Sequence, residues 1–316
     1  MNKNFYHGIM FHYFHGNKTH KKSQGSIDKD QLSNIIKKIG RKNILNADEF
    51  FYRHLEKKLK SNNVCFTFDD GLKSQFDIAL PILQDYKIKS FFFINTINYT
   101  DNKNYIELFR FFRNNFFKSI NEYYKEFFSY IDKDLNSFFK KELSTLKKLK
   151  QKFPYYSIND LKFRITRDSL LTKSEYIKIC FKMFDSKKFS YKKHLNKLYL
   201  SKKELVQISK LGHLIGLHSH SHHHKIESLK LEDQIKEYKK NLYLLEKILN
   251  KRKNEINYMS HPNGSYTTGT LKILNKLGIK LGFKQIMTIE KDKGMKKINN
   301  SPLEIARKPH NEILSC

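Results

Sequence analysis

The segment NVCFTFDDG (63–71) joins a short apolar run to two consecutive aspartates and a glycine. Valine, phenylalanine and threonine favour strands, and the run is of the length that a strand usually has. Asp69 and Asp70 follow it directly, and Gly71 favours a turn at the same point. The segment therefore predicts a strand that carries two carboxylates at its carboxyl end.

Strand-like and helix-like segments alternate around this strand. Apolar, aromatic runs predict strands at 8–16 and 89–96, and apolar residues at helical spacing predict helices at 26–40 and 74–88. Strands that alternate with helices usually lie parallel and are joined by helical crossovers. This pattern indicates an α/β domain, either a barrel or an open sheet, whose chemistry lies at the carboxyl ends of its strands.

The alternation stops after the third strand and resumes about one hundred residues later. No glycine occurs between Leu72 and Leu211, and residues 101–200 contain phenylalanine pairs at helical spacing. We interpret these pairs as core residues that pack an inserted helical subdomain onto its parent domain. Further segments then continue the pattern, with helices expected at 201–212, 229–252 and 268–278 and strands at 213–220, 256–266 and 279–286.

The segment LHSHSHHHK (217–225) gathers five of the fourteen histidines after one of these later strands. In a straight strand His218 and His222 would lie about 13 Å apart, too far to share an ion. A turn after the strand would bring positions i and i+4 to one side, and Asp70 could then supply a third ligand. Two histidines and one carboxylate leave open positions for water and substrate. The alternative is a polar histidine tract that binds metal only loosely.

Two adjacent aspartates at a strand end repel each other unless something neutralises them. A divalent ion would neutralise Asp70, and Asp69 would then be free to accept a proton from a water that the ion activates. The alternative is an ordinary turn with a capping aspartate. The histidine pair that follows another strand favours the metal site.

Together, FTFDDG (66–71) and HSHSH (218–222) resemble the first two motifs, T-F-D-D-G and H-[ST]-x-x-H, of the polysaccharide deacetylase family with NodB homology. GHLIGLHSHSH (212–222) and KIKSFFFIN (87–95) are similar to neighbouring parts of that family. The resemblance covers about 1–96 and 201–286.

This resemblance implies a distorted (β/α) barrel of about seven parallel strands that removes N-acetyl groups from amino sugars or glycans. It implies that Asp69 is the general base and that Asp70, His218 and His222 bind a divalent metal, with Zn²⁺ as the expected ion. The expected organisation is a first barrel part at 1–96, a helical insertion at 97–200, and a second barrel part with the C-terminal segment at 201–316.

The third motif of the family departs from its usual form. The family usually has an arginine before the proline, whereas MSHPNGSY (259–266) has Ser260 or His261 there. Since that arginine orients the base in relatives, the sequence predicts different or weaker base activation. The backbone N–H of Asn263 is expected to stabilise the oxyanion, because the residue after that proline does so in relatives.

A late histidine that serves as general acid in many relatives is not found. Some relatives carry it on the first strand instead, and MFHYFH (10–15) resembles that stretch. His12 is therefore the expected acid, with His15 as the second candidate and His310 as the third. The alternative for His12 is a histidine packed in the core.

The composition limits which binding partners and which cell compartment are expected. The net charge of +30 is spread along the chain and matches codon bias better than a specific nucleic-acid surface. It would attract an anionic substrate, such as a nucleotide-linked or lipid-linked amino sugar or another glycan precursor. Three scattered cysteines, the absence of a signal-like N-terminus and the absence of a transmembrane segment predict a cytoplasmic protein with at most peripheral membrane contact.

The expected function is thus a metal-dependent N-deacetylase. Three alternatives stay open at this point. One is a hydrolase of a non-sugar amide that uses the same site, and another is a degenerate barrel that acts as a binding or scaffold protein. The third is a nucleic-acid binder, which would have no need of Asp69.

Overall fold

The computed structural model describes residues 5–16, 19–152, 156–195 and 197–315. The chain divides into two compact units. The two ends of the chain, Met1–Asn104 and Asn196–Cys316, form the first unit, and Tyr105–Leu195 forms the second.

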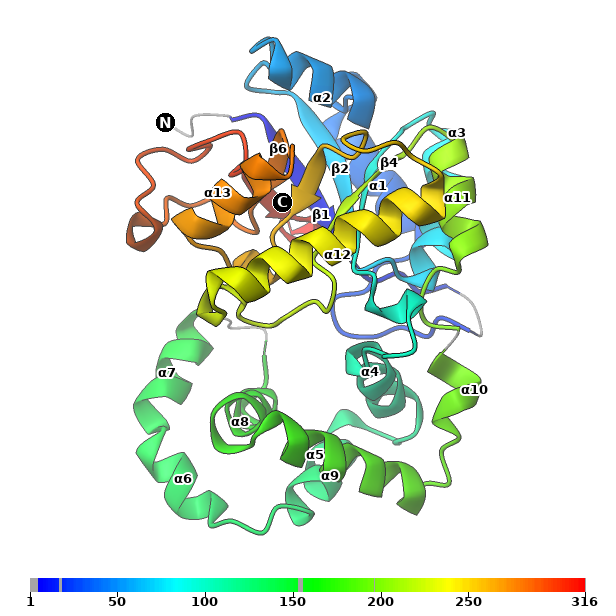
Figure 1. Ribbon diagram of the computed structural model, residues 1–316. Coiled ribbons are helices and arrows are strands. Elements are labelled where there is room, and N and C mark those ends of the chain that lie inside the picture. The colour runs from blue at the N-terminus through cyan, green and yellow to red at the C-terminus, as the bar shows by residue number, and fades with distance from the viewer. Residues whose placement is uncertain (1–4, 17–18, 153–155, 196, 316) are drawn as a thin grey trace. The chain divides into compact units, whose positions relative to one another are not determined.

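Seven parallel strands form the sheet of the first unit, in the order β6-β5-β4-β3-β2-β1-β7 (Figure 1). The segment that leads into β7 also pairs with β6, because Phe283 and Ile305 form a parallel bridge. The sheet is therefore a nearly closed (β/α) barrel, which confirms the predicted fold class. The strands are β1 (His7–Phe11), β2 (Val64–Asp69), β3 (Phe91–Ile94), β4 (Leu214–Leu217), β5 (Tyr258–Ser260), β6 (Leu281–Phe283) and β7 (Arg307–Pro309).

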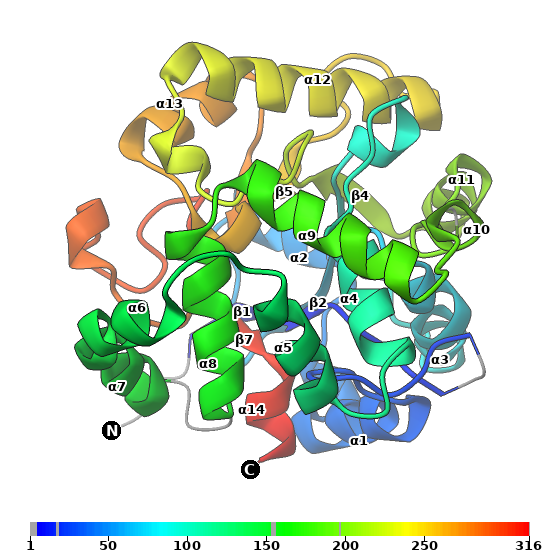
Figure 2. The same ribbon diagram turned by 90° about the horizontal axis from the view of Figure 1, so that it is seen from below.

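Helices surround these strands, as Figure 2 shows for α1, α3, α11, α12 and α13. Helix α1 illustrates how the sequence sets their bounds, because Asp28 caps its start in a capping box with Gln31 and Gly40 ends it. The helices of this unit are α1 (Lys29–Ile39), α2 (Ala47–Leu55), α3 (Leu80–Asp85), α11 (Lys202–Lys210), α12 (Leu231–Leu249), α13 (Thr268–Lys276) and α14 (His310–Leu314).

Phenylalanine rings fill the centre of the barrel. Every residue of β2 and of β3 is buried, because helices cover the outer face of the sheet and aromatic side chains fill its interior. The rings of Phe91 and Phe93 on β3 contact that of Phe283 on β6 across the interior, at centroid distances of 5.4 and 5.6 Å. This packing fixes the strand ends from which the polar residues project.

The second unit is helical, and its described residues contain no strand. Its phenylalanines pack mainly on one another inside the unit, as shown by the Phe112–Phe184 and Phe127–Phe163 ring distances of 4.7 and 4.9 Å. These pairs therefore share a core inside the unit. The helices are α4 (Ile106–Asn115), α5 (Ile120–Ser129), α6 (Leu135–Lys141), α7 (Leu143–Lys152), α8 (Ile158–Ile165), α9 (Lys173–Ser186) and α10 (Tyr191–Leu195).

The cysteines that the structure describes are unpaired. Cys65 and Cys180 are buried and free, and burial raises the pKa of both thiols, so neither is a reactive thiolate. Cys316 lies outside the described residues. Within the described ranges, no helix combines the length and the apolar character needed to cross a membrane.

Three buried histidines make the first unit sensitive to acid. Burial lowers the pKa of His213 and of His310 to about 4, and that of His261 to about 3. In the unfolded chain such groups titrate near 6.5. Between these values the unfolded state binds protons that the folded state does not. The contribution of these histidines to the free energy of unfolding is therefore present above pH 6.5 and is lost as the pH falls towards 4.

We therefore expect the free energy of unfolding to fall by about 3 kcal/mol between pH 6.5 and 4 for His213 alone. Urea titrations across this range measure the slope, and His213→Asn should make it shallower, since asparagine can still accept the hydrogen bond of the Ser90 N–H. Equal slopes for the wild type and His213→Asn would contradict the assignment.

Candidate active site

The carboxyl end of β2 carries the two aspartates on a sharp turn. Asp69 is the last residue of the strand, and Asp70 adopts a left-handed backbone conformation with φ of 77°. This conformation is uncommon for a residue other than glycine, and strain of this kind is often found at functional sites. Gly71 continues the turn with φ of 65°, and a Cβ added there would lie only 3.0 Å from Ile94.

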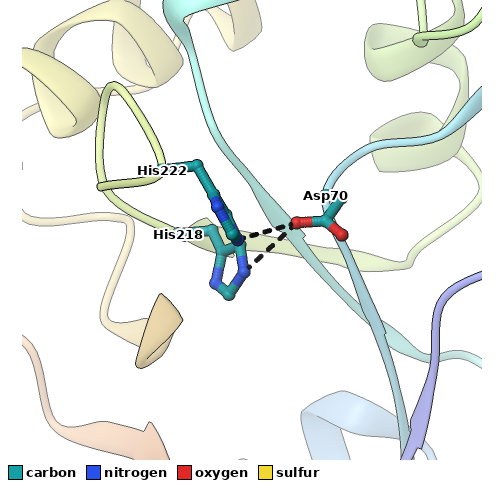
Figure 3. A group of neighbouring side chains, drawn as sticks. All are labelled: Asp70, His218 and His222. Carbon is teal, nitrogen blue, oxygen red and sulfur yellow. Dashed lines mark ion pairs between the residues drawn. The ribbon is translucent and has the colours of Figure 1, made fainter. Parts of the chain in front are cut away.

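Asp70, His218 and His222 converge on one point (Figure 3). The Oδ1 atom of Asp70 lies 3.4 Å from Nε2 of His218 and 3.1 Å from Nε2 of His222. His218 follows β4 directly, and left-handed backbone at Ser219 and at His222 reverses the chain. The turn after the strand thus brings both imidazoles to one side, as the sequence analysis required of a ligand pair.

These three side chains fit a divalent metal. Their ligand atoms all lie within 4.8 Å of one another. The Oδ1 atom of Asp70 is buried and accepts no hydrogen bond in good geometry from any described group, so it is an orphaned acceptor that faces two ring nitrogens. Burial would raise the pKa of Asp70, but His222 and the other nearby imidazoles hold it well below its usual value. One carboxylate and two imidazoles suit zinc and several other divalent ions.

Asn241 on α12 holds the backbone of the histidine loop. Its side chain, which is fully buried, accepts a hydrogen bond from the His218 N–H at 3.0 Å and donates to Ile94 O at 2.9 Å. It also donates to the hydroxyl of Thr96, which in turn bonds Nδ1 of His220 at 3.0 Å. His220 is therefore engaged in the support of the loop rather than in the histidine–aspartate cluster.

The ligand roles remain predictions that metal content can test. We expect His218→Ala and His222→Ala to lose most bound zinc after dialysis, because either change leaves only two ligands in place. His220→Ala is the matched control, since it removes an imidazole from the same loop and should leave about one ion per chain. Metal analysis of the purified proteins measures the difference. Equal losses in His218→Ala and His220→Ala would show that the assignment is wrong.

Asp69 is buried and paired with an arginine from the other end of the chain. Its Oδ1 atom lies 2.7 Å from Nη1 of Arg307, and both side chains are almost inaccessible, at 2 and 1 % exposure. The hydroxyl of Ser260 donates to the same oxygen at 3.2 Å. Burial would raise the pKa of Asp69, but Arg307 and the neighbouring histidines keep it below its usual value.

An arginine thus lies beside Asp69 although the third motif has none. The departure in the third motif predicted different or weaker base activation, and only His310 was a candidate site residue in the segment around Arg307. The arginine lies instead on β7, next to β1 in the sheet. No pattern in the sequence marks Arg307 as a site residue, because the three residues of β7 include a lysine and a proline and do not look like a barrel strand.

Among the three candidate acids, only His12 lies beside the two aspartates. The strand expected at 8–16 ends at Phe11, so His12 stands at the carboxyl end of β1. Its Nε2 atom lies 3.8 Å from Oδ2 of Asp69 and 4.0 Å from Oδ2 of Asp70. Burial lowers the pKa of His12, and the Asp70 and Asp69 carboxylates partly offset this effect.

The other two histidines bond elsewhere. His15 contacts the hydroxyl of Ser26 at 2.9 Å. His310 contacts the carbonyl of Met10 at 3.2 Å and stacks on Phe11.

The third-motif segment forms a tight turn directly after β5. Ser260 ends the strand and faces Asp69, whereas His261 turns away and bonds the carbonyl of Leu303 at 2.9 Å. Of the two residues considered in place of the arginine, it is thus Ser260 that contacts the base. Asn263 is exposed in the turn that follows and has a left-handed φ of 54°. Its proposed role as an oxyanion donor remains a prediction.

Comparison with known proteins agrees with this fold. The family model for polysaccharide deacetylases matches residues 56–114 and 125–282, which is more than half of the chain. The chain therefore belongs to the polysaccharide deacetylase family, as its first two motifs predicted. No curated protein matches the sequence.

Several solved structures share the fold at low sequence identity. The deacetylase PplD of Streptococcus pyogenes, solved in complex with acetate, has a TM-score of 0.55 and 16% identity and covers 98% of this chain and 96% of its own. A de-N-acetylase of Aggregatibacter actinomycetemcomitans has a TM-score of 0.52 and 12% identity, and the match covers 96% of this chain and 93% of the de-N-acetylase. IcaB of Ammonifex degensii has a TM-score of 0.51 and 13% identity, and the match covers 96% of this chain and 92% of IcaB.

Proposed function

We propose that this chain is a metal-dependent hydrolase that removes N-acetyl groups from an amino sugar or a glycan precursor. The convergence of Asp70, His218 and His222 beside the buried, arginine-paired Asp69 carries this proposal. The ligand cluster and the separate carboxylate supply the two parts that metal-assisted amide hydrolysis needs: an ion site and a proton acceptor next to it. Family membership supports the same reaction class.

A divalent cation at this site would supply Lewis acidity and make water a stronger acid near neutral pH. Asp69 then accepts the proton of the attacking water. Its Oδ1 atom is held by Arg307 and Ser260, so Oδ2, which faces His12, is the oxygen left for the proton. Holding one oxygen keeps the other in a fixed place and reduces the reorganisation that the reaction needs.

His12 completes the proton balance. Water adds to the acetamide carbon, and its proton passes to Asp69 and from Oδ2 on to Nε2 of His12, 3.8 Å away. The carbon–nitrogen bond then breaks as His12 donates that proton to the departing amine. The backbone N–H of Asn263 stabilises the oxyanion that forms in between. The products are acetate and a free amino sugar.

An anionic, precursor-like substrate suits this chain best. The net charge of +30 would draw a nucleotide-linked or lipid-linked amino sugar towards the protein. We place this reaction in the cytoplasm, in agreement with the free cysteines. PplD, a deacetylase with the same fold, was solved with acetate, which is the acid released in the proposed reaction.

Acetate release by the zinc-loaded protein tests the proposal. Nucleotide-linked, lipid-linked and oligomeric N-acetylated amino sugars are offered together with a panel of simple non-sugar amides. We expect release from at least one amino sugar, loss of that release after chelation, and recovery when zinc is restored. Release only from non-sugar amides would favour the alternative hydrolase. A protein that retains zinc but cleaves no substrate would favour the scaffold alternative.

A further inference from the structure

We infer that Ser260 is a positioning residue that joins the metal-ligand histidine to the general base. This inference rests on the proposed function and deepens it. Ser260 is one of the two residues considered in place of the third-motif arginine, and in this chain its hydroxyl lies between His218 and Asp69. The metal site and the proton acceptor are thereby connected through one side chain.

The geometry around Ser260 is that of a bridge. Its Oγ atom lies 2.7 Å from Nδ1 of His218 and 3.2 Å from Oδ1 of Asp69, and its carbonyl oxygen lies 3.0 Å from the same Nδ1. Ser260 and Asp69 are almost fully buried, with exposures of 0 and 2 %, and so is His218. Water therefore has little access to replace these bonds.

The number of hydrogens fixes the direction of this bridge. Since Nε2 of His218 faces the metal position, its other ring nitrogen, Nδ1, carries the hydrogen and donates it to the oxygens of Ser260. The single hydroxyl hydrogen of Ser260 is then available to Asp69, which only accepts. A chain of two hydrogen bonds thus runs from His218 through Ser260 to Asp69.

An arginine at position 260 could not form this bridge with its side chain. A guanidinium donates hydrogen bonds but accepts none, so it would contact Asp69 and offer nothing to Nδ1 of His218. In this chain the cation comes from Arg307, and Gly8 makes room for it, because a Cβ at position 8 would lie 3.0 Å from Cγ of Arg307. The relocated arginine leaves position 260 free for a residue that both accepts and donates.

Ser260→Ala, Ser260→Thr and a matched control, Ser265→Ala, test this role. Ser265 is also buried and lies in the same turn, where its hydroxyl accepts a hydrogen bond from the Glu227 N–H. We expect Ser260→Ala to weaken zinc binding by about tenfold or more, which is the loss usual when a partner of a metal-binding histidine is removed. We also expect its kcat to fall by a similar factor while KM stays close to the wild-type value.

The two readouts separate this inference from the proposed function. Zinc affinity is measured on the metal-free proteins by competition with a chromophoric chelator, and it needs no substrate. Ser260→Thr keeps the hydroxyl and should recover most of the affinity and the kcat, whereas Ser265→Ala should match the wild type. Ser260→Ala with a zinc affinity within threefold of the wild type would overturn the inference. An inactive wild type would instead refute the proposed function, and the affinity measurement would still decide the role of Ser260.

Discussion

Asp69→Asn is expected to abolish acetate release while zinc stays bound. Asparagine keeps the size of the side chain and can still accept a hydrogen bond at one atom, but it cannot take up the proton of the attacking water. A general base commonly contributes about 10²–10⁴-fold to a rate, so a loss of this size is expected in kcat. Zinc content should remain near one ion per chain, because Asp69 is not among the three converging ligand atoms.

Asp70→Asn provides the comparison, since it makes the same carboxylate-to-amide change at the neighbouring residue. It should lose activity and zinc together, because a neutral amide oxygen is a poor ligand compared with a carboxylate. Both variants are loaded with zinc, dialysed, and assayed for metal and for acetate release from the best substrate. If Asp69→Asn works within about threefold of the wild type, another group accepts the proton and the proposed mechanism fails.

Arg307→Met is expected to destabilise the protein strongly as well as to inactivate it. The change leaves the buried carboxylate of Asp69 without its cation, and removal of one partner of a buried ion pair typically costs about 3–5 kcal/mol. It also removes the hydrogen bond from Nε to the carbonyl of Lys284. Urea unfolding at neutral pH measures the loss, and the exposed Arg252 provides a control, because Arg252→Met should change stability by less than about 0.5 kcal/mol.

A double variant separates the ion pair from simple packing. Asp69→Asn combined with Arg307→Met removes both charges, so we expect its destabilisation to be smaller than the sum of the two single changes. Additive losses, or a loss below about 1 kcal/mol in Arg307→Met, would show that the pair is not what stabilises the buried carboxylate.

The parts of the site that could be predicted are those that lie next to a strand end in the sequence. Asp70 follows β2 and His218 follows β4, and parallel strands bring their carboxyl ends to one edge wherever they lie in the chain. The residue types and the short local spacing were then enough to suggest a shared ion. The turn that aligns His218 with His222 was also anticipated, because no straight strand could place both rings on one metal.

The contact between Arg307 and Asp69 could not be predicted in the same way. Strand β7 has three residues, and its lysine and proline are typical of a loop or an edge rather than a barrel strand. Its place is set by pairing with β1, near the opposite end of the chain.

The end of β1 was also misplaced, for a different reason. The apolar residue Phe14 remains buried beyond Phe11, where the strand ends. A buried residue in a loop and a buried residue in a strand are both apolar, so the sequence pattern does not show where the strand ends.

The pairing of β7 with β1 also sets the order in which the site is assembled as the chain is made. Asp70, His218 and His222 all leave the ribosome before Arg307, so the ligand cluster can be complete while Asp69 still lacks its cation. A chain that ends before β7 would contain these three side chains but not the cation that faces Asp69. The proposed hydrolysis would then depend on the last strand of the barrel, because Arg307 stands on it.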